Sequence, residues 1–172
     1  MKKELPNTIT APKRKTNGKR NRYAGHELER RVVLEFIELG FPHVCTSRSE
    51  NQTRDGQKVD IVNRDEVTNG RLRYNLQCKN TTSCLPYAKL LNEMPKGGPE
   101  INVIIHNHTK QSEGGRFVTK GQYAIMTKEG FYEMVRDIER YKKAFSLLND
   151  FFDSIPEAEK SAVDEELKTL GL

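Results

Sequence analysis

The sequence has few cysteines and no long apolar run, and these absences exclude several classes of protein. Its 172 residues include three cysteines without a C-x-x-C pair, which argues against a disulfide framework or a zinc knuckle and favours a reducing compartment. No run of about eighteen apolar residues occurs, and no apolar segment follows the lysines at the N-terminus. We therefore expect no membrane span and no secretory signal. The expected location is the cytoplasm, or the host cytoplasm if the protein is viral.

The chain also lacks the features of a large ATP-driven machine. Its length fits one domain, or one domain with tails, and its hydrophobic content of 35 % permits a single core. No phosphate-binding loop of the form G-x-x-x-x-G-K-[ST] occurs. A nucleotide-driven activity is therefore not expected.

Charge is divided among three zones. Residues 1–22 carry eight Lys or Arg against one Glu, a net +7, and residues 150–172 carry seven acids against two lysines, a net −5. The basic segment has too little apolar surface to fold and suits a polyanion, because neutralising phosphates releases counterions. We expect a disordered basic tail over 1–22, a folded domain over 23–149 and an acidic helix or tail over 150–172. Nucleic acid is the first partner to consider, with a solvated solubility tail as the alternative.

Hydrophobic periodicity predicts an α/β or α+β fold with a mixed central sheet flanked by helices. Asn69-Gly70 is expected to be the turn of a hairpin, the apolar run 101–105 an interior strand, and Thr127 a helix N-cap. The predicted helices span 24–39, 86–94 and 127–148; the predicted strands span 42–49, 58–63, 72–79, 101–105 and 123–126. A polar loop is expected at 47–52, and a loop or edge hairpin at 114–121.

Polar residues are expected to converge on one edge of this sheet. Asp60 lies in an apolar strand, and Gln77 and Lys79 share one face of the partner strand because residues two apart point the same way. The hairpin brings Asp60 near Gln77, with an offset of a residue or two left open. A carboxylate, an amide oxygen and an ammonium suit a divalent cation and a phosphate. Glu29, at the edge of the apolar face of the first helix, is the fourth candidate; a solvated strand face with a turn-forming Asp is the alternative.

These residues resemble the PD-(D/E)XK nuclease superfamily, particularly its archaeal-type Holliday junction resolvases. The resemblance covers about residues 20–80 and rests on a short series of motifs: Gly25 followed by Glu29-Arg30, Gly40-Phe41 at the helix end, Ser49 in the loop, Val59-Asp60-Ile61-Val62, and Gln77-Cys78-Lys79 where Glu-x-Lys is usual. It implies a restriction-endonuclease-like core with the order α-β-β-β-α-β. It also implies that the folded domain over 23–149 is a nuclease domain.

The resemblance implies a Mg²⁺-dependent endodeoxyribonuclease that cuts phosphodiester bonds in branched DNA, in recombination or repair. Asp60, the Gln77 amide oxygen and the Cys78 backbone carbonyl would hold Mg²⁺, or Mn²⁺ as a substitute, and Glu29 would contribute through water. Lys79 would orient or deprotonate the attacking water. The implied catalytic set is Glu29, Asp60, Gln77 and Lys79, and the expected DNA contacts are Arg30, Arg48, Ser49, Lys13, Arg14, Lys15, Lys19, Arg20 and Arg22.

A homodimer is implied as well, because a four-way junction needs paired cuts and a two-fold dimer supplies two equivalent sites. Apolar positions on the last long helix are the candidate interface, among them Phe145, Phe151 and Phe152. The same positions also suit an ordinary core.

One position departs from the family pattern and keeps two alternatives open. Gln77 replaces the second metal-binding carboxylate, so the site loses one unit of negative charge. Gln-x-Lys is the form of Mrr-type restriction endonucleases, which the chain resembles almost as well. The alternatives are therefore an Mrr-like restriction-type nuclease and a non-catalytic nucleic-acid-binding protein of the same fold. The short chain favours the resolvase, since it leaves no room for an added recognition domain.

Overall fold

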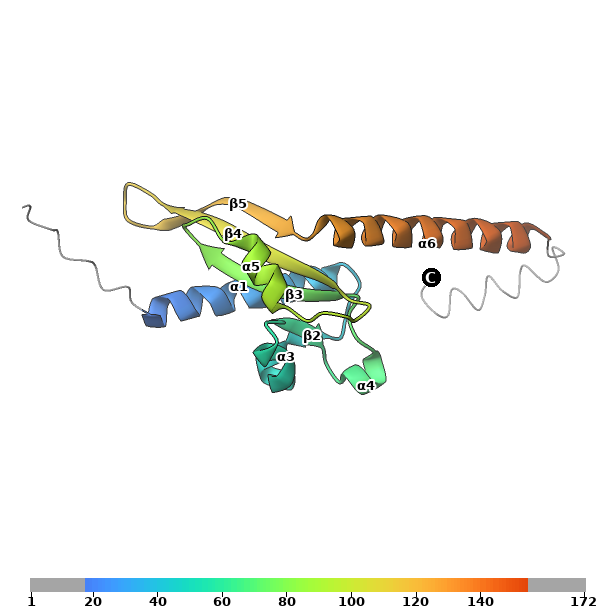
Figure 1. The fold of residues 1–172 in the computed structure, drawn as a ribbon, viewed down its shortest axis with the longest axis horizontal. Coiled ribbons are helices and arrows are strands. Elements are labelled where there is room, and N and C mark those ends of the chain that lie inside the picture. The colour runs from blue at the N-terminus through green and yellow to red at the C-terminus, as the bar shows by residue number, and fades with distance from the viewer. Residues whose placement is uncertain (1–17, 155–172) are drawn as a thin grey trace, which may run out of the picture.

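The computed structural model describes residues 18–154 and contains a five-stranded mixed sheet with helices around it (Figure 1). The strand order is β1-β2-β3-β4-β5, and only β3 and β4 pair in parallel. The elements are α1 (Gly18–Glu38), β1 (Val44–Thr46), α2 (Ser47–Glu50), α3 (Gln52–Gly56), β2 (Ile61–Asn63), α4 (Glu66–Asn69), β3 (Tyr74–Thr81), α5 (Tyr87–Glu93), β4 (Ile101–Gln111), β5 (Phe117–Ile125) and α6 (Lys128–Ser154). The mixed α+β class predicted from the sequence is confirmed. In the described part of the chain, none of the helices has the length and apolarity needed to cross a bilayer.

The first helix supplies one side of the core. Leu28 and Val32, four residues apart, are each 2 % exposed. They pack with residues of the strands and with one residue just before β3: Val44, Ile61, Leu72, Leu76, Cys78, Ile101 and Val103. The helix ends at Glu38, one residue before the predicted end, and Gly40 follows with a φ of +93° that suits a residue without a side chain. It begins earlier than predicted, at Gly18, so residues 18–22 belong to α1 and not to a tail. The reason is that Lys and Arg are good helix formers and nothing after Gly18 breaks the helix.

Two local predictions for the segment between β1 and β3 were wrong in detail. The region 47–52, expected as a polar loop, forms α2 and the start of α3. The β2–β3 pair is antiparallel as predicted, with Ile61 opposite Leu76, but its connection contains the helical turn α4 before Gly70 instead of a tight turn at Asn69-Gly70. Short polar segments give no periodic signal, so side-chain caps decide their structure. In α3 the Asn51 side chain accepts a hydrogen bond from the Arg54 backbone N–H at 3.1 Å.

A buried arginine anchors this polar segment to the sheet. Arg54 is 7 % exposed, and its Nη2 donates to Asn75 Oδ1 at 2.9 Å. Its Nε lies 3.7 Å from Glu66 Oε1, and Asn75 Nδ2 donates in turn to Asn102 Oδ1 at 2.9 Å. Asn75 and Gln77 are two residues apart in β3 and share one face. Arg54 therefore fixes α3 against the face of β3 that carries Gln77.

The two C-terminal strands are longer than their apolar runs. β4 continues past the predicted 101–105 to Gln111, and β5 begins at Phe117, well before the predicted 123–126, so 114–121 is largely an edge hairpin. Backbone pairing accounts for the extra length, since a ladder continues through polar residues as long as both strands supply N–H and C=O groups. β4 lies between β3 and β5, as the apolar run predicted for an interior strand.

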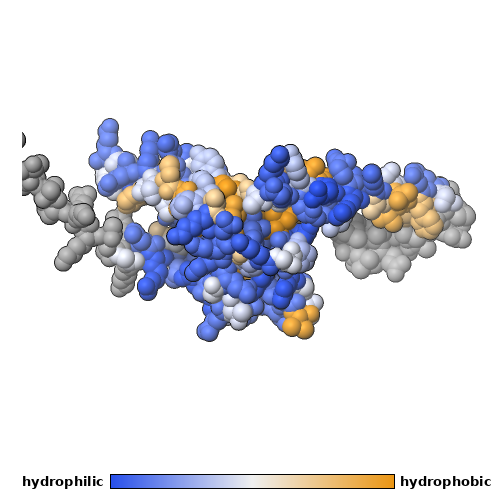
Figure 2. All heavy atoms as spheres, in the orientation of Figure 1, coloured by the Kyte–Doolittle hydropathy of each residue, from blue (hydrophilic) through white to orange (hydrophobic). Residues whose placement is uncertain are grey.

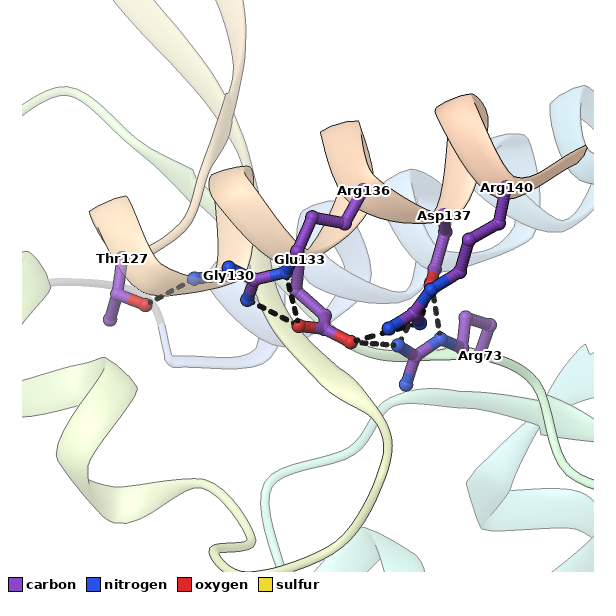
Figure 3. Close-up of polar contacts among 7 residues, drawn as sticks. All are labelled: Arg73, Thr127, Gly130, Glu133, Arg136, Asp137 and Arg140. Atoms are coloured by element: carbon purple, nitrogen blue, oxygen red, sulfur yellow. Dashed lines mark hydrogen bonds and ion pairs between the residues drawn. The ribbon is translucent and has the colours of Figure 1, made fainter. Parts of the chain in front are cut away.

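The last helix starts at the predicted cap and is tied to the sheet by charged groups (Figure 3). Thr127 Oγ1 accepts a hydrogen bond from the Gly130 N–H at 3.0 Å. Arg73 Nε donates to Asp137 Oδ2 at 2.9 Å, and Arg73 Nη2 donates to Glu133 Oε1 at 3.3 Å. α6 continues through residue 150 to Ser154, so the structure shows no break where the acidic zone begins. No glycine or proline interrupts that stretch, and Pro156 comes later.

The Thr127 cap leads to a stability prediction. Thr127→Ala should lower the free energy of unfolding by about 1 kcal/mol, because it leaves a helix N–H without its partner. In a chain of this length that corresponds to a Tm lower by about 2–4 °C in a thermal unfolding experiment followed by circular dichroism. Thr127→Ser keeps the hydroxyl and serves as the matched control. Equal Tm values for the alanine and serine variants would contradict the role of the cap.

Candidate active site

The candidate site lies where the pairing of β2 with β3 ends. The two strands are paired at Ile61 and Leu76, while β3 continues to Thr81. Asp60 comes directly before this last pair, at the point where β2 leaves β3. The Asp60 N–H donates to the Leu76 carbonyl at 2.8 Å, and its own carbonyl accepts from the Ser47 N–H at 2.9 Å. The backbone of Asp60 is thus held from two sides, next to the edge of β3 that β2 does not cover.

The Asp60 side chain is directed at this edge. Its Oδ2 accepts a hydrogen bond from the Cys78 backbone N–H at 2.7 Å. Because the N–H and C=O of one strand residue point to the same edge, the Cys78 carbonyl oxygen also lies on the Asp60 side. The Cys78 side chain packs in the core against α1, and burial raises the pKa of its thiol far above the usual range. The thiol therefore stays protonated and is not a nucleophile.

Gln77 has a buried oxygen without a partner. The residue is 1 % exposed, and its Oε1 accepts no hydrogen bond from the described part of the chain. Leaving a buried acceptor unsatisfied costs about 1–3 kcal/mol, so native structures seldom do so without reason. An oxygen in this condition, on the residue next to the Cys78 that Asp60 binds, is available to a bound cation.

Glu29 reaches the same region from α1 and is held there by an arginine. The residue is 4 % exposed, and its Oε1 accepts a hydrogen bond from Arg48 Nη2 at 3.0 Å. Arg48 Nε also lies 3.6 Å from Asp55 Oδ1, and its Nη1 is hydrogen-bonded to His26 Nε2. Arg48, predicted as a DNA contact in a loop, therefore links α1, α2 and α3 around the site.

Burial and nearby negative charge disfavour the charged forms of the two carboxylates. Burial, followed by the charge of Asp60, raises the pKa of Glu29, and Arg48 and Lys79 oppose this shift. Burial also raises the pKa of Asp60, and the charge of Asp55 raises it further. The hydrogen bond from the Cys78 N–H and the positive charges of Lys79 and Arg48 act in the opposite direction. A bound cation would relieve this repulsion. Paired carboxylates with raised pKa values are typical of functional sites.

This electrostatic arrangement gives a pH prediction for Asp60→Asn, which keeps an acceptor for the Cys78 N–H. Folding raises the pKa of Asp60, so the ionised carboxylate destabilises the folded state once the pH exceeds that raised value. Below the ordinary pKa of about 3.9, Asp60 is protonated in both the folded and the unfolded state and has no such effect on stability. The variant should therefore gain about 1 kcal/mol of stability at pH 7, or a Tm about 2–4 °C higher without divalent cations. The gain should disappear as the pH falls below about 4. A variant less stable than wild type at pH 7 would contradict the unfavourable charge.

The other predicted residues have mixed positions. Lys79 lies on the face of β3 that carries Gln77, and it influences the pKa values of both Glu29 and Asp60. Within residues 18–154 it forms no ion pair of 4 Å or less. The exposed Ser49 hydroxyl donates to the Thr46 carbonyl at 2.7 Å, within its own turn. Lys19 and Arg20 belong to α1, and Lys13, Arg14 and Lys15 lie outside the described residues.

A row of basic residues runs along α1 beside the site. Arg22, His26 and Arg30 are spaced by four and share one face of the helix. Burial lowers the pKa of His26, and the charges of Arg48, Arg30 and Arg22 lower it further, so the four groups lie in one electrostatic field. Sequence reasoning found the two α1 arginines but missed His26. The spacing of four was the signal that could have found it.

Asp55 was missed as well. It precedes Asp60 by five residues in a segment expected to be irregular, and α3 brings it to Arg48. No motif marked it. Only the helical turns of α2 and α3, which the sequence did not reveal, place it near the site.

No protein-family model, no curated protein and no solved structure matches the chain. The function therefore rests on the geometry of the site and on the residues that form it.

The donor set fits an oxygen-preferring cation. Within the described residues no group of three or more His, Cys, Asp and Glu could hold a metal ion, so a zinc-type site is not formed there. Mg²⁺ and Mn²⁺ instead accept carboxylate, amide and carbonyl oxygens and, in the case of Mg²⁺, retain several waters. The Asp60 carboxylate, the unpaired Gln77 Oε1 and the Cys78 carbonyl form such a set, with Glu29 close by.

Proposed function

We propose that this chain is a metal-dependent DNA endonuclease of the PD-(D/E)XK type, with a restriction-endonuclease-like core, that cuts branched DNA such as a four-way junction. The observation that supports the proposal most strongly is the unpaired oxygen of Gln77, which shares a strand face with Lys79 and precedes the Cys78 whose N–H binds Asp60. A merely solvated strand face would not bury an amide oxygen without a partner. A cation site needs such an oxygen.

Each residue of the candidate site has its own role in the proposed reaction. Asp60, Gln77 and the Cys78 carbonyl would hold Mg²⁺ or Mn²⁺, with Glu29 acting through water. The bound cation would polarise a phosphoryl oxygen and acidify a bound water. Lys79 orients the attacking water, and its ammonium stabilises the negative charge that develops on the phosphate. Arg48 keeps the Glu29 carboxylate at the site through the 3.0 Å hydrogen bond.

The charges around the site suit a nucleic-acid backbone. Arg22 and Arg30 are exposed on one face of α1, next to the catalytic candidates. Lysines and arginines that contact phosphates position DNA without reading its sequence, as expected of an enzyme that recognises branch structure. Paired cuts at a junction would require two such sites, so the proposed enzyme acts as a homodimer.

The experiment compares a synthetic four-way junction with a linear duplex of the same sequence, each with Mg²⁺, Mn²⁺ or a chelator. The proposal predicts paired nicks in the junction, none in the linear duplex, and none with chelator. Cleavage of the linear duplex only when it carries methylated bases would instead indicate an Mrr-like restriction-type enzyme. Absence of cleavage under every condition would contradict the enzymatic proposal.

One observation favours a second candidate, a non-catalytic nucleic-acid-binding protein of the same fold. Arg48 occupies an oxygen of Glu29, and Gln77 brings no charge to the site, so attraction for a cation is reduced. Junction binding that is unchanged by Mg²⁺, without cleavage, would support this candidate.

A further inference from the structure

Large apolar side chains are exposed along the length of α6. The helix extends beyond the end of the sheet (Figure 1), and Figure 2 shows apolar side chains gathered along it. Phe131, Ile138, Tyr141, Phe145 and Leu148 are between 45 % and 75 % exposed. Single exposed apolar residues are common, but a continuous stripe of large ones marks an interaction surface.

The spacing of this stripe specifies the kind of partner. Its positions advance by three and four in strict alternation over three heptads: Phe131, Met134, Ile138, Tyr141, Phe145, Leu148 and Phe152. This is the a/d pattern with a period of 3.5 residues that forms the seam of a left-handed coiled coil. A sheet or an irregular peptide does not match that period, whereas another helix with the same repeat does. At its N-terminal end the stripe is used internally, because Met134 packs against the core.

We propose that α6 pairs with α6 of a second copy of this chain as a parallel two-stranded coiled coil. A second copy carries the same repeat, and in a parallel pair its a and d residues meet their own counterparts layer by layer along the seam. The flanking charges Asp137 and Lys142 are paired within the chain, with Arg73 and Glu139. Apolar contact between the two stripes therefore accounts for the association.

The exposed apolar area of α6 is close to what one partner buries in a standard interface. An aromatic side chain covers about 150–250 Å², and Phe131, Tyr141, Phe145 and Phe151 are 48–75 % exposed. Together with Ile138 and Leu148 they leave roughly 700 Å² of apolar side chain to bury on each copy. A standard protein interface buries about 800 Å² per partner.

The test is the mass of the full-length chain, measured by light scattering after size exclusion, against a monomer mass of 19.8 kDa. The wild-type chain should have twice the monomer mass at micromolar concentration, and Phe145→Glu should be monomeric because it places a charge in the seam. Ser146→Glu, the neighbouring position outside the seam, adds the same charge and should remain dimeric. Unchanged circular dichroism in both variants would show that the fold is kept.

The orientation has its own test in a Cys84→Ser background, which removes the exposed native thiol. Leu148→Cys should form a disulfide between copies under oxidising conditions, since d positions meet in a parallel pair, and Ser146→Cys should not. A monomeric wild-type chain would overturn the proposal and would leave residues 155–172 of the same chain as the occupant of the stripe. A dimer that survives Phe145→Glu would overturn it too, because the interface would then lie elsewhere.

The measured mass does not depend on cleavage, so this proposal and the proposed nuclease function can fail separately. If the dimer and the nuclease proposals both hold, the Phe145→Glu variant should still nick a junction. Its two cuts should then occur independently of each other, because the two active sites are no longer held in one dimer.

Discussion

Replacing Lys79 by alanine is expected to lower the rate of DNA cleavage by about 10²–10³-fold or more while the affinity for DNA changes little. The reason is that the Lys79 ammonium acts on charge that develops only as the phosphate reacts, and one preorganised group of this kind contributes on that scale. Lys79 shares its strand face with Gln77 and influences both Glu29 and Asp60. The measurement is a single-turnover cleavage rate on a four-way junction, with the dissociation constant determined by gel shift in a chelator.

The matched control is Lys110→Ala, which removes an exposed lysine from the neighbouring strand β4. This variant also loses one positive charge, but it leaves the residues of the candidate site unchanged, so it should cut at close to the wild-type rate. Asp60→Ala should be as inactive as Lys79→Ala. Retained cutting by either site variant would remove the proposed mechanism, and an equal loss in the Lys110 control would point to a general effect of charge on DNA binding.

Changing Gln77 to glutamate is expected to tighten Mg²⁺ binding by about 10-fold or more and to destabilise the metal-free protein by about 1–3 kcal/mol. The side chain keeps its length but brings a third carboxylate to Glu29 and Asp60, whose pKa values are already raised by burial. Without a cation the added charge is uncompensated, and with one it becomes a ligand. The two effects are measured by calorimetric titration of Mg²⁺ and by denaturant unfolding in a chelator.

Gln77→Met provides the opposing control, since methionine has nearly the same volume and no oxygen. It removes the unpaired acceptor, so the metal-free protein should be as stable as wild type or more stable, and Mg²⁺ binding should be lost. A large loss of stability together with unchanged Mg²⁺ affinity would contradict the assignment, because the Gln77 oxygen would then serve the fold.

Periodic features of this chain could be predicted from the sequence because a repeating pattern reports on a buried face. The apolar stripe around Leu28 and Val32 predicted α1, and the continuous apolar run from Ile101 predicted the interior strand β4. Alternation in the segments that contain Asp60 and Gln77 predicted their antiparallel pairing, which is why these two residues were expected to meet.

Features that depend on single polar contacts could not be predicted in this way. Arg54 anchors α3 through Asn75, and Arg48 holds Glu29 from the far side of the site. Neither arginine stands out from its polar neighbours in the sequence, because its partner is distant along the chain. For the same reason, that the Gln77 oxygen is left without a partner could not be predicted and is seen only in the packed structure.

The central claim is that Asp60 and Gln77 form a divalent-cation site, and it is tested most directly by counting bound Mn²⁺. Electron paramagnetic resonance of free Mn²⁺, during titration of the full-length chain, gives the number of ions bound per chain without any DNA present. The account predicts one bound Mn²⁺ per wild-type chain and at least about 10-fold weaker binding by Asp60→Asn, because the charged ligand is lost. Equal binding by the two proteins, or no binding by wild type, would contradict it.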